Sequence, residues 1–159
     1  MAVRNVLIKG DPRLRQPSQA VPPGQFGDRA LLALVQDLRD TMAARDGAGL
    51  AAPQIGVPLQ VVIFGITHNP RYPEAPPIPE TVLVNPEITP LGPELESGEE
   101  GCLSVPGLRA AVPRWRRVRY AAFTPWGEPL EREVEGFHAR VVQHECDHLA
   151  GILFTDRLG

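Results

Sequence analysis

The sequence predicts an α+β domain in which short strands lie between one N-terminal helix and one C-terminal helix. Two segments with helical periodicity bracket a middle part that is made of short apolar runs. Fifteen glycines and eighteen prolines among 159 residues require many turns, so we expect few long helices. This length favours a single domain that spans residues 1–159.

The segment before the first long helix is predicted to hold only short elements. Val6–Ile8 is a short apolar patch that can form an edge strand. Asp11 followed by Pro12 indicates a capped helical turn, because proline suits the first helical position. Residues 16–27 contain three prolines and two glycines and therefore predict a loop.

The first long helix is predicted over Asp28–Arg45. Asp28 is a typical N-cap residue and Gly47 a typical stop. The apolar residues between them recur at helical spacing and form one stripe: Leu31, Leu32, Leu34, Val35, Leu38 and Met42. We therefore expect this helix to pack against the core and to carry no chemistry.

The middle of the chain is predicted to form short strands separated by turns. Val61–Ile66 is almost entirely apolar and indicates a buried strand, whereas the five prolines of His68–Pro79 indicate a surface loop. Two more strands are expected on either side of Asn85-Pro86, at Thr81–Val84 and Glu87–Thr89. A hairpin is expected around Pro125-Trp126-Gly127, with its strands at Val118–Thr124 and Glu128–Val134.

The last predicted helix, from about Phe137 to Ala150, carries the most specific chemical signal. It contains an H-E-x-x-H motif formed by His144, Glu145 and His148. Residues four apart share one helix face, so both imidazoles can reach one metal ion, and Glu145 lies where it can reach a water on that ion. We therefore expect short antiparallel or mixed strands packed around a C-terminal metal-binding helix.

A catalytic metal site of this kind usually has three protein ligands, and the third must come from upstream. The candidates are Cys102, His68, His138 and the acidic residues. Cys102 follows a glycine and would bind as a thiolate, although burial as a small hydrophobe is the usual fate of a free cysteine. Cys146 is expected to pack away from the metal face, and His138 and His68 are expected to be exposed.

The segment Gly47–Gln54, with the sequence GAGLAAPQ, leaves its backbone nearly bare of side chains. Such a segment suits a ligand that lies along the chain, with the Gln54 amide as a hydrogen-bond donor. A tightly packed turn that leads into the strand at Val61 would have the same composition. Both readings stay open on this motif alone.

Charge and hydropathy exclude several classes of partner. The net charge of −3 argues against general binding to DNA or RNA, and no apolar run is long enough to span a membrane. The first residues do not form a secretory signal, so we expect a cytoplasmic protein, and its composition suggests a monomer. The stretch Arg114–Arg119 holds four arginines and Trp115; it either contacts ribosomal RNA transiently or is an exposed strand with solvated charges.

Three segments in this order and spacing resemble the peptide deformylases. They are GAGLAAPQ at Gly47–Gln54, EGCLS at Glu100–Ser104 and QHECDH at Gln143–His148. The resemblance extends from about Pro12 to Arg157. It implies a hydrolase that removes the N-formyl group from the initiator formylmethionine of nascent peptides and releases formate. A zinc endopeptidase, based on the H-E-x-x-H motif alone, is the alternative.

The resemblance also assigns roles to residues around the metal. It implies that Cys102, His144 and His148 bind one divalent ion, with water as the fourth ligand, and that Glu145 is the general base and then the acid. Gln54 and the backbone N–H of Leu103 would bind the developing oxyanion. Fe(II) is the implied native ion, while Zn(II), Ni(II) or Co(II) suits the same ligands.

For the substrate, the resemblance implies an added strand and a side-chain pocket. The backbone at Ala48, Gly49 and Gly101 would hydrogen-bond the peptide. The pocket for the methionine side chain would be lined by Phe137, Val141 and the stem of Arg140. We also hypothesise that Arg114 pairs with Asp147 behind the metal site.

Overall fold

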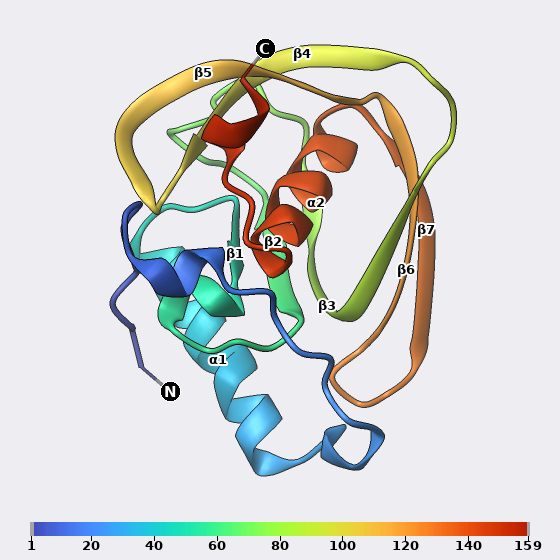
Figure 1. Ribbon diagram of the computed structural model, residues 1–159. Coiled ribbons are helices and arrows are strands. Elements are labelled where there is room, and N and C mark those ends of the chain that lie inside the picture. The colour runs from blue at the N-terminus through green and yellow to red at the C-terminus, as the bar shows by residue number, and fades with distance from the viewer. Residues whose placement is uncertain (1, 159) are drawn as a thin grey trace.

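The computed structural model describes residues 2–158 as two antiparallel sheets and two long helices (Figure 1). The helices are α1, Arg29–Ala44, and α2, Gly136–Leu149. The five-stranded sheet has the order β1-β2-β3-β6-β7, and β4 and β5 form the second sheet. The strands are β1 Gly49–Ala51, β2 Val61–Ile66, β3 Ile78–Pro90, β4 Leu95–Cys102, β5 Val105–Trp115, β6 Arg117–Phe123 and β7 Pro129–Glu135. The predicted α+β class is confirmed.

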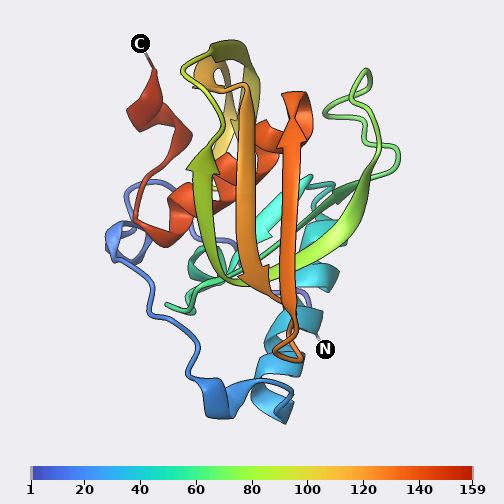
Figure 2. The same cartoon turned by 90° about the vertical axis from the view of Figure 1, so that its right-hand side faces the viewer.

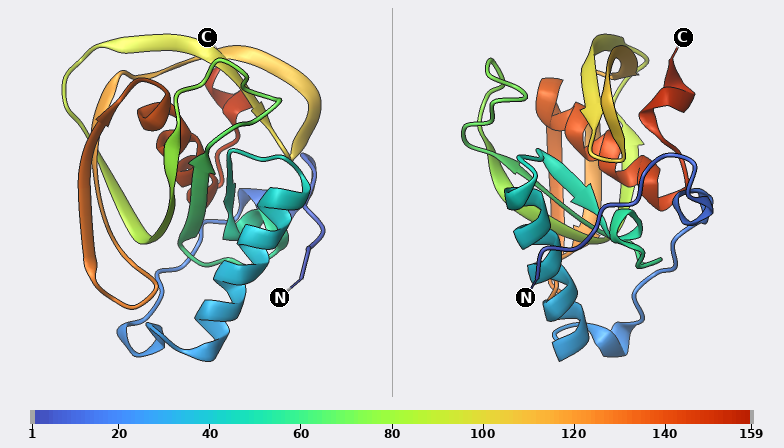
Figure 3. Two further views of the ribbon diagram at one scale, coloured as in Figure 1. Left: turned by 180° about the vertical axis from the view of Figure 1, so that it is seen from behind. Right: turned by 90° about the vertical axis from the view of Figure 1, so that its left-hand side faces the viewer.

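Helix α2 lies against one face of the large sheet, and α1 covers the opposite face near β1 and β2 (Figures 2 and 3). Strand β2 shows why both faces are apolar. Val62 and Phe64 pack in the cluster that contains α2, whereas Val61 and Ile63 pack in the cluster that contains α1. Because successive residues of a strand point to opposite faces, a strand covered on both sides reads as one continuous apolar run.

Both long helices lie within one residue of their predicted limits, but Asp46 rather than Gly47 adopts the left-handed conformation after α1. The Asp28 carboxylate accepts a hydrogen bond from the Leu31 N–H at 2.8 Å and so caps α1. Helix α2 ends at Leu149, and Gly151 follows with a φ of +77°, the left-handed conformation that commonly ends a helix. The predicted turn after Asp11 is also present, as a 3-10 helix over Pro12–Arg15.

The two strands predicted around Asn85-Pro86 are one long strand, β3. Its pairing with β6 shifts register between Val84 and Glu87, and Asn85 has a φ of +53° there. The Asn85 side chain accepts from the N–H of Val21 and donates to the Val21 carbonyl, at 2.8 and 3.0 Å. Asn85-Pro86 is therefore a bulge within a strand rather than a turn.

The sequence reasoning missed the β4–β5 hairpin and wrongly predicted an edge strand at Val6–Ile8. Strand β4 has the sequence LESGEEGC and is mostly exposed, so it lacks the apolar alternation that identifies a strand. Near the N-terminus, the Leu7 N–H donates to Gln54 and the Lys9 N–H to Ser104. These single bonds reach two different segments, so no strand ladder forms.

The other predicted elements agree with the structure. Strands β6 and β7 form the expected hairpin, paired from Arg117 with Glu135 to Phe123 with Pro129. Residues 68–77 form a loop, and β3 already begins at Ile78, one residue before the predicted end of that loop. Within residues 2–158, no helix is long and apolar enough to cross a membrane.

Candidate metal centre

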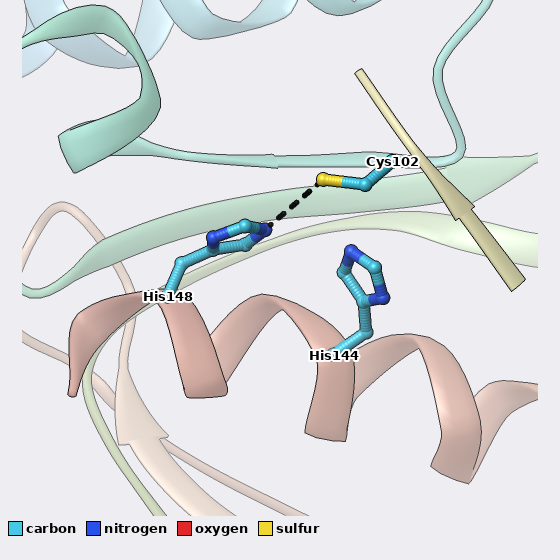
Figure 4. A group of neighbouring side chains, drawn as sticks. All are labelled: Cys102, His144 and His148. Carbon is cyan, nitrogen blue, oxygen red and sulfur yellow. Dashed lines mark hydrogen bonds between the residues drawn. The ribbon is translucent and has the colours of Figure 1, made fainter. Parts of the chain in front are cut away.

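Helix α2 and the end of β4 bring three potential metal ligands together (Figure 4). His144 and His148 lie one turn apart on α2 and point toward Cys102, the last residue of β4. The Cys102 Sγ lies 3.5 Å from the His148 Nε2, and one ligand atom from each residue lies within 4.8 Å of the others. All three residues are buried. The candidate third ligand Cys102 therefore joins the two histidines.

The donor set and spacing fit a divalent transition-metal ion. Sulfur and nitrogen ligands bound tetrahedrally at about 2.3 and 2.1 Å lie roughly 3.5 Å apart, which matches the distance between Cys102 and His148. The Glu145 Oε1 and the His148 Nδ1 are buried without a hydrogen-bond partner among the described residues. Buried polar atoms normally have partners, so the Glu145 Oε1, on a residue that lines the same pocket as Cys102 and His144, can receive a further polar group; the His148 Nδ1 is not the ring nitrogen that faces Cys102.

Electrostatics favour the ionised form of Cys102. Burial disfavours the thiolate of Cys102. The charge of His148 and hydrogen bonds from His144 and His148 outweigh this effect of burial, so the pKa of Cys102 falls well below its ordinary value. A thiolate is the form of cysteine that binds metals. Cys146 differs, because burial raises its pKa above the ordinary thiol range, and it packs beside the core as expected.

A buried carboxylate orients the first histidine. The Glu100 Oε1 lies 2.8 Å from the His144 Nδ1, which leaves the Nε2 of that ring for the metal. Burial opposes ionisation of Glu100, but hydrogen bonds from Arg114 and His144 lower its pKa to about 2. The sequence covered Glu100 only among the acidic candidates for the third ligand, and not as a residue that orients a histidine. An acidic residue two positions before a candidate ligand was the available signal, since metal-bound histidines usually pair with a carboxylate.

Two buried arginines hold Glu100 in place. Arg114 donates to both Glu100 oxygens at 2.9 Å, and Arg140 donates to Oε2 at 2.7 Å and to the Val112 carbonyl. The head group of Arg140 is therefore held within the protein, and Arg140 also lines the pocket. Arg114 also donates to Asp147 at 2.6 Å, which confirms the hypothesised pair.

This burial of Arg114 corrects the interpretation of 114–119 as one exposed basic stretch. Arg114 is 4 % exposed, because its charge is neutralised inside the protein. Arg116 and Arg117 are exposed, and each lies near a glutamate: Arg116 is 3.3 Å from Glu94, and Arg117 is 4.0 Å from Glu135. The surface there is of mixed charge rather than basic.

Gln54 is fixed with its amide nitrogen toward Cys102. Its Oε1 accepts from the Ala51 N–H at 2.9 Å, and its Nε2 donates to the Ser104 Oγ at 2.9 Å. The same Nε2 lies 3.6 Å from the Cys102 Sγ. The orientation of this buried amide is thus determined by the backbone, with its donor at the metal cluster.

The bare backbone of the glycine–alanine segment lies against Glu145. A Cβ atom at Gly49 would stand 2.6 Å from the Glu145 Oε2, so no other residue fits there without displacing that carboxylate. Burial raises the pKa of Glu145, which makes it a better proton acceptor than a solvated glutamate. The segment is therefore a site element and not only a turn before β2.

Gly49 also presents a free strand edge. The Ala48 carbonyl accepts from the Gly65 N–H at 3.0 Å, so Ala48 faces β2. Because backbone groups alternate in direction along an antiparallel strand, the N–H and C=O of Gly49 point to the open side of β1. This edge can receive an extended peptide, and the carbonyl of Ala48 is already engaged elsewhere.

A pocket joins these groups. The predicted site residues that line it are Ala48, Gly49, Gln54, Gly101, Cys102, Leu103, Phe137, Arg140, Val141, His144 and Glu145. His148 is almost fully buried and is not among the residues that line the pocket. Arg71 and Tyr72 also line the pocket, and sequence reasoning missed them because they lie in the proline-rich loop. No periodicity or motif connects that loop to the site.

Of the other two histidines, one prediction holds and one is wrong. His68 is exposed in the loop, as expected. His138, predicted to be exposed, is half-buried and lies 3.0 Å from the Tyr120 hydroxyl with its ring against Phe64. The first turn of α2 packs on the sheet, which covers this ring.

Comparison with known proteins gives consistent matches along the chain. The model of the family described as polypeptide deformylase matches residues 3–159. Peptide deformylase 1 from Nitrosomonas europaea is 58 % identical over 156 residues, which cover 98 % of this chain and 88 % of that protein. Peptide deformylase 1 from Prochlorococcus marinus is 57 % identical over 99 % of this chain and 82 % of its own.

Solved structures agree with this result. A class I type b peptide deformylase from Acinetobacter baumannii, with Met-Ala-Ser bound, superposes with a TM-score of 0.95 and 41 % identity, covering 99 % of both chains. Peptide deformylase from Thermotoga maritima gives a TM-score of 0.86 at 34 % identity, over 100 % of this chain and 99 % of that one.

Proposed function

The chain belongs to the peptide deformylase family, and from this premise we propose how its residues perform the reaction. The protein is a hydrolase that removes the N-formyl group from the initiator formylmethionine of nascent peptides and releases formate. The observation that supports our assignment of residues is the convergence of Cys102, His144 and His148 from two distant segments. The zinc endopeptidase alternative is not favoured.

We propose that Cys102, His144 and His148 hold a single divalent ion. Such an ion lowers the pKa of a coordinated water toward neutrality and polarises a carbonyl group. Glu100 supports this role, because it fixes the ring of His144 with Nε2 toward the cluster. Glu145 is not counted among the ligands, since its carboxylate lies against Gly49.

Glu145 moves the protons in the proposed mechanism. Its carboxylate accepts a proton from the attacking water and then delivers it to the nitrogen that leaves as the new N-terminus. Burial supports both steps, because a raised pKa brings the carboxyl group closer to neutral pH. The orphaned Oε1 is the available acceptor atom.

Two donors stabilise the charge that develops on the formyl oxygen. We assign these to the Gln54 Nε2, which the Ala51 N–H and Ser104 hydroxyl hold in place, and to the backbone N–H of Leu103. Removing one such donor typically lowers the rate by about 100- to 1,000-fold. Because Gln54 is already oriented, it needs no rearrangement when the charge appears.

The substrate peptide is proposed to add to the open edge of β1 at Gly49 and to the edge of β4 at Gly101. Phe137, Val141 and the stem of Arg140 line the pocket that takes the methionine side chain. Ala48 contributes to the wall, although its carbonyl is bonded to Gly65. A formyl group is small enough to reach Glu145 past the bare backbone of β1.

We propose Fe(II) as the native ion, in line with the resemblance and with a thiolate–imidazole donor set that Zn(II), Ni(II) and Co(II) also accept. Metal analysis of protein purified without oxygen tests this directly. We further propose that residues 1–159 act as one catalytic domain and that the protein works in the cytoplasm as a monomer. Transient contact with the ribosome stays a prediction, with Arg116, Arg117 and Arg119 as the candidates.

One assay separates the deformylase from the peptidase. We expect the anaerobically purified protein to release formate from formyl-Met-Ala-Ser and to leave casein intact. Cleavage of casein without formate release would contradict the proposal. Measuring the metal content of the same sample shows whether the active fraction is the one that carries the ion.

A further inference from the structure

Tyr72 occupies the strand edge where the substrate is proposed to bind, an inference that rests on the proposed function. The Gly101 N–H donates to the Tyr72 hydroxyl at 3.1 Å, and the hydroxyl lies 3.4 Å from the Gly101 carbonyl oxygen. One hydroxyl thus faces both backbone groups of Gly101. An added peptide strand would offer its own carbonyl and N–H to these same two atoms.

The ring of Tyr72 is held over the pocket by three neighbours. Its centroid lies 5.1 Å from that of Phe137, and the guanidinium carbon of Arg109 lies 4.6 Å from it. Arg109 in turn pairs with Glu99 on β4 at 2.6 Å. The guanidinium of Arg71 lies 5.9 Å from the same ring, which gives a second cation–π contact.

These side chains cover Gly101 itself. A Cβ atom at Gly101 would stand 3.0 Å from the Arg71 Nη2 and 3.2 Å from the Arg109 Nη1. The space just above this backbone is therefore filled by the loop and by β5. A peptide strand cannot bond to the N–H and carbonyl of Gly101 while the Tyr72 hydroxyl keeps this position.

The loop is anchored at its base by Asn69. Asn69 is buried, and its side-chain amide donates to the Asp46 carbonyl at 2.9 Å. Its Oδ1 accepts from the Arg71 N–H at 2.8 Å, which fixes the turn that carries Tyr72. Beyond this turn, the Tyr72 hydroxyl reaches Gly101 on β4. Asn69 fixes the base, while the tip is held by Tyr72 and its neighbours.

We propose that Tyr72 competes with the main chain of the substrate for Gly101, so that peptide binding requires its hydroxyl to leave this edge. The competition raises KM and leaves kcat unchanged, because Tyr72 contacts neither the metal cluster nor Glu145. A hydrogen bond of ordinary strength corresponds to about a 3- to 10-fold change in an equilibrium constant. Tyr72 is therefore a residue that sets substrate affinity through its hydroxyl.

The kinetic test compares Tyr72→Phe with wild-type holoenzyme on formyl-Met-Ala-Ser. The variant keeps the ring that packs on Phe137 and Arg109 and removes only the hydroxyl. We expect KM to fall by about 3- to 10-fold with kcat within about twofold of the wild type. His68→Gln, an exposed change in the same loop, is the matched control and should leave both constants unchanged. An unchanged or increased KM in Tyr72→Phe would overturn the proposal.

A second test does not depend on catalysis. Hydrogen exchange of the Gly101 amide in the substrate-free protein should be about 3- to 10-fold faster in Tyr72→Phe than in wild type, because the hydroxyl no longer accepts from it. Equal exchange rates would overturn the inference even if deformylation proceeds. If the wild-type protein releases no formate while the exchange rates differ as expected, the proposed function fails and the contact at Gly101 stands.

Discussion

Arg114 donates a hydrogen bond of 2.6 Å to Asp147, and in doing so it ties the β4–β5 hairpin to the back of the metal-binding helix. The same guanidinium bonds to both oxygens of Glu100. One buried cation therefore links the strand that supplies Cys102 to the helix that supplies the two histidines. Relative placement of the three ligands depends on this connection.

Replacing Arg114 by methionine should destabilise the protein strongly. The side chain is 3 % exposed, and its loss leaves Glu100 as a buried charge with fewer partners. Breaking a buried ion pair costs about 3–5 kcal/mol in the free energy of unfolding. Arg116→Met, at an exposed position two residues away, should change the free energy of unfolding by less than about 0.5 kcal/mol. Urea unfolding measures both, and similar values for the two variants would contradict this role.

Glu100→Gln should weaken metal binding without removing a ligand. The amide cannot match the charge that pairs with His144, Arg114 and Arg140, so the imidazole is less firmly oriented. Loss of such a partner typically lowers metal affinity by about 10- to 100-fold. Competition with a chelator measures the affinity, with Glu94→Gln as the exposed control. Equal affinities in the two variants would show that Glu100 does not support the site.

Glu145→Gln should retain the ion and lose activity. The amide has nearly the shape of the carboxylate but cannot accept the proton, so kcat should fall by about 100- to 10,000-fold. Metal content per chain should match that of the wild type. Measuring formate release and metal on one preparation tests both statements. Loss of the ion from the variant would instead identify Glu145 as a ligand.

His138 should make the protein less stable in mild acid. Burial and the charge of Arg132 lower the pKa of His138, and its other polar neighbour is the Tyr120 hydroxyl. The unfolded chain therefore takes up this proton at a higher pH than the folded protein does. The free energy of unfolding should fall as pH decreases below about 6.5.

The check for His138 is urea unfolding at several pH values between 7.5 and 5. The wild type should lose more stability over this range than His138→Gln, which has no proton to bind. Parallel pH dependence in the two proteins would show that another group is responsible. His138 lies six residues before His144, the nearest proposed metal ligand in the sequence, so the experiment can use the metal-loaded protein.

The sequence was most informative where one local pattern determines the outcome. Helix α2 and its histidine pair follow from spacing within one element, and α1 follows from its apolar stripe and the Asp28 cap. Such features depend on neighbours three or four positions apart. The meeting of Cys102 with the histidines depends on tertiary structure, and residue reasoning alone left the third ligand open; the family resemblance identified it.

What escaped prediction depends on contacts between distant segments. Strand β4 is polar, and it is a strand because it pairs with β5 and because buried arginines hold it to α2. Asn85 suggested a turn, but its side chain bonds to Val21 and makes a bulge instead. Tyr72 lies in a proline-rich loop with no motif, so only the folded chain reveals that its hydroxyl reaches Gly101.

X-ray absorption spectroscopy at the metal edge of the active, anaerobically purified enzyme tests the central claim most directly. We predict one ion per chain whose protein ligands are one sulfur and two imidazole nitrogens, from Cys102, His144 and His148. A spectrum without sulfur in the coordination shell of the active enzyme would contradict the assignment.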